Sequence, residues 1–369
     1  MTSTAETVGV TVPPPKDRTW RRPLRVVLIG APALWLVFVL AHLLVSGRVW
    51  WWRPADLLPP FLFPAVPILL TLAAWPCRRS RRPAAVLSLA GLAAGLSLAG
   101  LNVGAPLTAA PPAPAGALRV VSWNTQYWHE PGLAADFYAL LTRQRADVYL
   151  LQEYLRYPGD SPLRIDELAE LRARLPGYHI AVAGELITLS RYPITARYGL
   201  DAPGADPPPG AAFPEFWRYK TLRTDLRVGD RVLSVYNVHL PTPLWIGGGG
   251  PLSAAFWDTI RNLHEERGPQ LAALNRDLAA NGNAKLVAGD MNTTPAMGER
   301  HAFAGGLRDA ADAGDTPYPA TWPVNGVYFP TWWRLDWALV SPEVTTHRYE
   351  LRDPAGQSDH RLQYLVVSL

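Results

Sequence analysis

Three apolar stretches in the first 103 residues constrain this chain more than any other feature of its sequence. They cover residues 24–46, 57–77 and 84–103, and each approaches the roughly 20 residues that a helix needs to cross a bilayer. The second contains Pro59, Pro60, Pro64 and Pro67, so a kinked helix is expected there. A signal peptide would explain one stretch, and core helices of a soluble domain are a further alternative. Three stretches at this spacing favour three transmembrane helices.

Basic residues in the loops predict the orientation of these helices. The N-terminal tail has five Lys or Arg residues and the second connection reads RRSRR over 78–82, whereas the first connection has only Arg48 and Arg53. Cytoplasmic loops carry the excess of Lys and Arg in membrane proteins. The sequence therefore predicts a multi-pass protein of the cell membrane, with a cytoplasmic N-terminus and an extracytoplasmic region after residue 103.

The balance of basic and acidic residues differs between the first 103 residues and the rest of the chain. Residues 1–103 contain 11 basic and 3 acidic residues, whereas the remainder contains 24 basic and 28 acidic residues. A net-acidic region argues against nucleic acid as the preferred partner, because binding to a phosphate backbone needs a positive field. Cys77 is the only cysteine. The exported region therefore has no disulfide, and its stability must come from a buried core.

The region after residue 103 has the pattern of a layered α/β domain. A Pro/Ala-rich linker is expected over 104–117, followed by one domain over 118–369. Helices are expected over 135–145, 165–174 and 256–280. Short apolar runs predict strands over 118–124, 147–153, 178–184, 186–190, 221–228, 231–240, 284–290, 335–341 and 363–369. Because a Gly229–Asp230 turn marks a hairpin while helices separate other strands, mixed sheets are predicted.

Polar side chains recur at the ends of these expected strands, where α/β sheets collect their sites. Asp290 and Asn292 follow one strand and would project together, because residues i and i+2 point the same way on extended backbone. The other candidates at strand ends are Asn124, Glu153, His239, Asp336, Asp359 and His360. Each alone also has a structural explanation, such as a turn asparagine, a solvated glutamate or a core histidine.

Taken in order, these segments resemble the endonuclease/exonuclease/phosphatase superfamily of divalent-metal phosphoesterases. The resemblance runs through SWN, LLQE, ITLSRYPI, NVHL, GDMN, LDWALVS and SDH, and it covers about residues 118–369. It implies the DNase I-like fold, which is a layered α/β sandwich with two mixed β-sheets flanked by helices. Hydrolysis by direct attack of water would be the reaction.

The resemblance also implies a role for each candidate residue. Asn124, Glu153 and Asp359 would hold Mg²⁺ or Mn²⁺, which is a hard cation that prefers oxygen ligands. Asp290 would orient or deprotonate the attacking water, and Asn292 would donate to a phosphoryl oxygen. His239 would contact the phosphate, while Asp336 would hold His360 and favour its protonated form. The number of metal ions stays open.

Three functions are compatible with these features. The leading hypothesis is a membrane-anchored, extracytoplasmic phosphoesterase acting on a phosphorylated lipid or another small phosphoester. The layout is similar to that of the teicoplanin-resistance membrane proteins of actinomycetes, which implies action on cell-envelope lipid intermediates. An extracellular nuclease is one alternative and would need a basic groove. A catalytically inactive binding module is the other. Stretches 244–257 and 327–337, with Arg334 near a phosphate, are candidates for substrate specificity.

Overall fold

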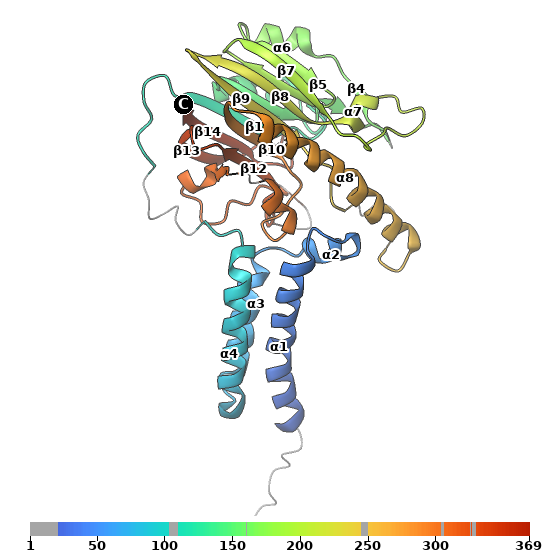
Figure 1. The fold of residues 1–369 in the computed structure, drawn as a ribbon, viewed down its shortest axis with the longest axis vertical. Helices are drawn as coiled ribbons and strands as arrows, with labels where there is room; N and C mark the ends of the chain where they lie inside the picture. The colour runs from blue at the N-terminus through green and yellow to red at the C-terminus, as the bar shows by residue number, and fades with distance from the viewer. Residues whose placement is uncertain are drawn as a thin grey trace, which may run out of the picture.

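Two six-stranded β-sheets pack face to face in a computed structural model of the protein (Figure 1). The structure describes residues 21–102, 110–159, 161–244, 250–303, 306–324, 326 and 330–369. The first sheet has the order β13-β14-β1-β2-β6-β5. Its strands are β1 (Leu118–Asn124), β2 (Val148–Gln152), β5 (His179–Ala183), β6 (Leu186–Ser190), β13 (Thr345–Arg352) and β14 (Leu362–Ser368).

The second sheet has the order β11-β12-β10-β9-β8-β7. Its strands are β7 (Ile194–Asp201), β8 (Tyr219–Val228), β9 (Arg231–His239), β10 (Ala284–Asp290), β11 (Arg308–Asp309) and β12 (Asp336–Val340). Each sheet is mixed, because β1 pairs with β2 and β9 pairs with β10 in parallel while the other pairs are antiparallel. Short strands β3 (Leu155–Arg156) and β4 (Leu163–Arg164) form a separate ribbon.

Helices cover the outer face of each sheet. Helices α5 (Ala134–Gln144) and α6 (Leu168–Arg174) pack on the first sheet, and α8 (Ala254–Ala280) packs on the second. A short helix α7 (Pro214–Arg218) precedes β8. Helix α5 joins β1 to β2 and α8 joins β9 to β10, because parallel neighbours need a long crossover. The predicted layered α/β fold with mixed sheets is therefore confirmed.

The expected elements of this domain agree with the structure within a few residues. All nine strands and all three helices predicted from the sequence are present. The two-residue strands β3, β4 and β11 and the short helix α7 are not among the predicted elements, and neither are the longer strands β7 and β13. Both are edge strands whose side chains are largely exposed or half-buried. Their sequences, ITARYGLD and TTHRYELR, therefore lack the apolar runs by which the buried strands were recognised.

The N-terminal region forms a helical stalk next to this domain (Figure 1). Helix α1 (Arg21–Val45) packs against α3 (Leu62–Ala74) and α4 (Arg78–Gly95), and a short α2 (Arg53–Asp56) lies in the connection after α1. The expectation of three spanning helices is wrong by the criteria of length and composition. Among the described residues, only α1 is long and apolar enough to cross a membrane, and one such helix is also compatible with a signal sequence.

Local sequence explains why the other two helices do not meet these criteria. Prolines 59 and 60 delay the second helix until Leu62, so α3 has 13 residues and a length of about 20 Å. Helix α4 begins within RRSRR, so charged residues occupy its first turns. The expected linker lies partly outside the described residues, since residues 103–109 are among those not described.

Candidate active site

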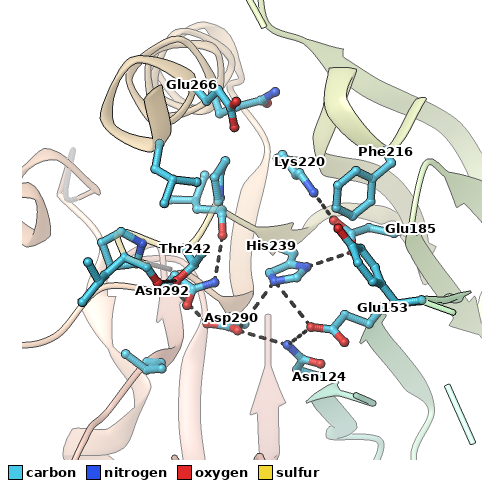
Figure 2. A pocket seen from close by; sticks show the side chains of 18 of the residues that line it. Asn124, Glu153, Glu185, Phe216, Lys220, His239, Thr242, Glu266, Asp290 and Asn292 are labelled. Atoms are coloured by element: carbon cyan, nitrogen blue, oxygen red, sulfur yellow. Dashed lines mark hydrogen bonds and ion pairs between the residues drawn. The ribbon is translucent and has the colours of Figure 1, made fainter. Parts of the chain in front are cut away.

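The sequence candidates meet around one cavity of about 920 Å³ (Figure 2). Strand register brings their backbones together, because Asp290 pairs directly with His239 on β9 and with Asp336 on β12. The first sheet contributes Asn124 at the end of β1 and Glu153 just after β2. The cavity is therefore built where the carboxyl ends of the parallel strands of both sheets converge.

Asn124 joins the acidic groups at the base of the cavity. Its amide Nδ2 donates to Glu153 Oε1 and to Asp290 Oδ2, both at 3.0 Å, and its Oδ1 accepts the backbone N–H of Gln126 at 3.0 Å. Glu153 Oε2 accepts the backbone N–H of Tyr127 at 2.9 Å. One amide thus links carboxylates from the two sheets and fixes their separation.

The backbone conformation at three positions orients the side chains of the site. Glu153 has φ 61° and Asn292 has φ 45°, which is a left-handed conformation that costs a residue with a Cβ roughly 1–2 kcal/mol. Gly289 has φ +150°, and a Cβ there would lie 1.9 Å from the carbonyl oxygen of Val238. The glycine of GDMN is therefore required for β10 to approach β9, and it places Asp290 beside His239.

His239 is held by a carboxylate that the sequence analysis did not identify. Its Nδ1 lies 3.1 Å from Glu185 Oε2, so the two groups form an ion pair when His239 is protonated. Its Nε2 lies 3.7 Å from Asp290 Oδ2 and 3.9 Å from Glu153 Oε1. The ammonium group of Lys220 pairs with the other oxygen of Glu185 (Figure 2).

Burial and neighbouring charges set the protonation of Glu185, His239 and Glu153. Burial alone would raise the pKa of Glu185, but His239 and then Lys220 hold it down to about 2. Burial opposes the charged form of His239, yet Glu185, Asp290 and Glu153 raise its pKa above the usual 6.5. The pKa of Glu153 is raised, mainly because the carboxylate is buried. His239 is therefore favoured as a cation by the three carboxylates around it.

His360 has the same arrangement on the opposite side of Asp290. Its Nδ1 donates to Asp336 Oδ2 at 2.9 Å, and its Nε2 lies 3.7 Å from Asp290 Oδ2. Burial disfavours the imidazolium, but Asp336 and Asp290 raise the pKa of His360 well above its usual value. Two imidazoles thus present Nε2 atoms to one carboxylate, each oriented through Nδ1 by its own acid.

The remaining candidates line the same cavity. The amide Nδ2 of Asn292 donates to the carbonyl of Leu240 at 2.9 Å, and its backbone N–H donates to Asp290 Oδ1 at 2.8 Å. Asp359 Oδ2 accepts the indole N–H of Trp322 at 2.8 Å, and its Oδ1 lies 3.9 Å from His360 Nε2. All eight predicted site residues are therefore brought together. Seven of them line the cavity, whereas Asp336 lies behind His360 and does not.

The oxygen atoms at the base of the cavity are suitable ligands for a hard divalent cation. Glu153 and Asp290 supply carboxylate oxygens on either side of Asn124, and Mg²⁺ and Mn²⁺ prefer such ligands. Burial raises the pKa of Glu153, and a cation bound beside this carboxylate would favour its charged form. Asp290, Asp336 and His360 also have possible ligand atoms within 4.8 Å of one another. Since Asp336 already accepts from His360, that group is better explained as an oriented imidazole.

Glu185, Lys220 and Trp322 are the site residues that sequence reasoning missed. Glu185 lies in the two-residue turn between β5 and β6, and Lys220 lies at the start of β8. Glu185 and Lys220 do not belong to a strand-end motif that contains another candidate. The sequence around them therefore does not indicate a functional site. Glu185 is fully buried, and a buried acid in a polar turn needs a partner. That partner is visible only after folding.

The structure describes only part of residues 244–257 and 327–337, the two candidate stretches for substrate specificity. Residues 245–249 and 327–329 lie outside the described residues. Trp333 lines the cavity. Arg334 does not lie near a phosphate position, because it is buried, forms a bidentate pair with Asp309 and covers the ring of Trp337. Its role is to hold β12 in place.

The model of the Endonuclease/Exonuclease/phosphatase family matches residues 121–360. The search of curated proteins finds no match. A solved endonuclease/exonuclease/phosphatase from Beutenbergia cavernae is 18% identical, with 69% of this chain and 72% of that chain covered and a TM-score of 0.48.

Two further solved structures carry more specific descriptions. A mannosyl-6-phosphatase from Bacteroides thetaiotaomicron is 14% identical, with 68% of this chain and 100% of that chain covered and a TM-score of 0.46. Sphingomyelinase C from Streptomyces griseocarneus is 18% identical, with 68% and 99% covered and a TM-score of 0.47. At these identities and TM-scores, neither structure informs on the substrate of this chain.

Proposed function

Because this chain belongs to the endonuclease/exonuclease/phosphatase family, whose model matches residues 121–360, we propose that it is a divalent-metal-dependent phosphoester hydrolase. The observation that carries the proposal is the placement of His239 and His360 on either side of Asp290. Each histidine holds a carboxylate partner on Nδ1 and turns Nε2 toward Asp290. Such a site can bind an anion and activate a water molecule at adjacent positions.

Each residue of the site has its own proposed role in hydrolysis. Asp290 orients the attacking water and accepts its proton. His239 and His360, both favoured as cations by their acidic neighbours, contact the phosphoryl oxygens. Asn292 uses one amide hydrogen on the Leu240 carbonyl, which leaves the second for a phosphoryl oxygen.

Asn124 and Glu153 are the proposed cation ligands, and Asp359 completes the set directly or through water. A divalent cation bound there would offset the charge of the phosphoryl group.

The walls of the cavity favour a lipid substrate over a polynucleotide. Leu240, Leu244, Leu263, Trp217 and Trp333 contribute apolar surface. Lys220 is the one Lys or Arg among the described residues that line the cavity, and it already pairs with Glu185. A nuclease needs several cations along its groove. The extracellular nuclease is therefore the weaker alternative, and a phosphorylated lipid is the proposed substrate.

The membrane segment is consistent with this substrate. Leu57, which follows α2 in the connection between α1 and α3, contributes to the same cavity. If α1 is anchored in the cell membrane, the cavity opens close to the bilayer and receives its substrate there. The basic loop residues favour a cytoplasmic N-terminus, so the proposed location of the active site is the outer side of the membrane.

The test is a hydrolysis assay with the full chain in detergent micelles. Release of phosphate or phosphorylated headgroup is measured from a lipid phosphate, an isoprenoid diphosphate, a phospholipid and DNA, each with Mg²⁺ and with a chelator. We expect turnover of a lipid with Mg²⁺ and its loss with the chelator. His360→Ala should lower kcat by about 10²–10⁴-fold, whereas the exposed His179→Ala serves as the matched control.

Each other outcome has a defined meaning. Turnover of DNA alone would replace the lipid proposal with the nuclease. Equal turnover by the His360→Ala variant would refute the assigned site. The absence of turnover on every substrate would support the inactive binding module, provided that wild type and variant show the same thermal unfolding.

A further inference from the structure

The loop that follows Asp290 packs directly on the N-terminal helices. Ala296, within this 291–299 loop, belongs to one buried apolar cluster with Val39 of α1, Phe63 of α3 and Leu98. The ring Nε2 of His42 lies 2.8 Å from the carbonyl oxygen of Ala296. The loop bearing Asn292 is therefore in contact with a segment outside the expected domain over 118–369.

Glycines allow the two backbones to approach closely. A Cβ at Gly298 would lie 2.2 Å from the carbonyl oxygen of Ser46, and a Cβ at Gly47 would lie 2.9 Å from the backbone nitrogen of Glu299. Gly100 approaches Pro295 in the same way, with 2.4 Å between its added Cβ and the proline Cγ. The amide of Gly298 also donates to Ser46 Oγ at 2.8 Å. The interface therefore brings the backbone at Gly298 and Glu299 against the backbone at Ser46 and Gly47.

A buried chain of charges links this interface to both catalytic loops. Arg53 of α2 forms a bidentate pair with Glu299, with 2.9 Å between Nη1 and Oε2. Glu299 Oε2 in turn accepts from Arg267 Nε on α8 at 2.9 Å. Arg267 then donates to the carbonyls of Met291 at 2.8 Å and Pro241 at 2.5 Å. Pro241 is two residues beyond His239, and Met291 is adjacent to Asp290.

The burial of these charges shows that they act as a unit. Arg53 and Arg267 are fully buried, and Asp56 lies 3.6 Å from Arg53 while it accepts from Ser46 Oγ at 2.6 Å. Two cations and two carboxylates are thus removed from water together. Loss of one member leaves an uncompensated buried charge, which is strongly destabilising to the local arrangement. The remaining members must then shift or admit water.

We propose that the 46–57 segment, between α1 and α3, positions the catalytic loops, and that Arg53 is a positioning residue. It acts through Glu299 and Arg267 on the backbone at Met291 and Pro241, and so on Asp290 and His239. This inference rests on the proposed hydrolase function for its kinetic consequence. It extends the active unit beyond the region that the family model covers, into the helical stalk. Movement of the stalk would be transmitted to Asp290 through these contacts.

The test compares Arg53→Ala and Arg53→Lys in the full chain with Arg48→Ala. Arg48 is exposed in the same connection and is the matched control. We expect kcat to fall at least about 10-fold in Arg53→Ala, because small displacements of reacting groups cost up to about 10²-fold. KM should change little, and Arg53→Lys should recover part of kcat because it keeps the charge without the planar fork.

A second variant separates the backbone contact from the charge. Gly298→Ala places a methyl group against Ser46, whereas a Cβ at Gly282 meets nothing within 4 Å. Gly298→Ala should lower kcat as Arg53→Ala does, and Gly282→Ala should not. Thermal unfolding of each variant identifies any that simply fails to fold.

Hydrogen exchange provides a readout that needs no substrate. In Arg53→Ala and in Gly298→Ala, the amides of the 291–299 loop should exchange faster than in wild type, and those of β1 should be unchanged. Unchanged exchange and kcat in both folded variants would overturn the inference. A wild-type chain that hydrolyses nothing, while the loop still loses protection in the variants, would refute the proposed function and leave the positioning contact standing.

Discussion

At the scale of single residues, the site depends on acids that orient histidines. Asp336 accepts from the Nδ1 of His360, Glu185 forms an ion pair with the Nδ1 of His239, and both histidines turn Nε2 toward Asp290. Because an acid beside Nδ1 holds the ring in one orientation, the Nε2 of each imidazole is directed at the reacting position. The sequence identified Asp336 through its motif, whereas Glu185 was not recognised. Each acid lies beside the Nδ1 of one histidine, so removal of either should disturb the histidine that it orients.

Glu185→Gln should shift the pH dependence of kcat. Glu185 raises the pKa of His239 above 6.5, so the imidazolium persists to higher pH in the wild type. Without that carboxylate the pKa of His239 falls, and the cation is lost at lower pH. We therefore expect the alkaline limb of the kcat profile to move to lower pH, measured at fixed Mg²⁺ concentration.

The matched control for this variant is Glu215→Gln, which removes a carboxylate from a surface pair with Arg164. Its profile should coincide with that of the wild type. An alkaline limb that stays in place in Glu185→Gln would mean that His239 does not act as a cation.

At the scale of elements, the site depends on how closely two parallel strands approach. Strand β10 runs beside β9 with Asp290 opposite His239. Gly289 makes this register possible, because its φ of +150° and missing Cβ let the backbone lie against Val238. The same requirement explains why an apolar strand ends in Gly-Asp: the glycine fits the close approach and the aspartate faces the cavity.

Gly289→Ala should therefore separate the two strands. A Cβ placed 1.9 Å from a carbonyl oxygen cannot be accommodated without backbone movement, and we expect a loss of stability of roughly 3 kcal/mol. Activity should fall as well, since Asp290 moves with the strand. The measurement is thermal unfolding of the full chain together with kcat. Gly282→Ala, just before the same strand, should match the wild type in both, and a stable, active Gly289→Ala variant would contradict this account.

At the scale of the whole molecule, the catalytic domain and the helical stalk are joined by buried contacts. Polar and apolar contacts connect α1, the 46–57 segment and Gly100 to the 291–299 loop. The exposed apolar side chains of α1, including Leu34 and Val37, find no cover among the described residues. Such a surface suits lipid rather than water. Anchoring through α1 would therefore hold the cavity at a fixed distance from the bilayer.

Arginines at the centre of α1 should release the chain from membranes. Leu34→Arg with Val37→Arg adds two charges at exposed central positions, at a cost of about 2.5–3.5 kcal/mol each. We expect a smaller share of the protein in the alkali-washed membrane fraction. Val26→Arg with Val27→Arg, near the end of the helix, should have less effect because the side chains can reach the interface. Equal retention of all three proteins would argue against α1 as the anchor.

Much of the fold and most of the site could be predicted from the sequence, because the information is local. Buried strands such as 284–290 are continuous apolar runs, and the residues that follow them are polar. Their order along the chain was sufficient to indicate a layered α/β domain and to select Asn124, Glu153, Asp290 and His360. Apolar runs do not predict edge strands β7 and β13, because these strands are polar on their exposed sides. The number of spanning helices was overestimated because composition alone does not show where a helix begins.

Tertiary structure decided the contacts between segments far apart in the chain. Glu185 becomes the partner of His239 only when β6 and β9 lie in facing sheets. Arg53 meets Glu299 across 246 residues, and no pattern near either residue indicates the other. The sequence determined which side chains lie at strand ends, since a strand has a fixed period and a clear boundary. It could not determine which buried charges neutralise one another, because that depends on distances set by the packing of the complete chain.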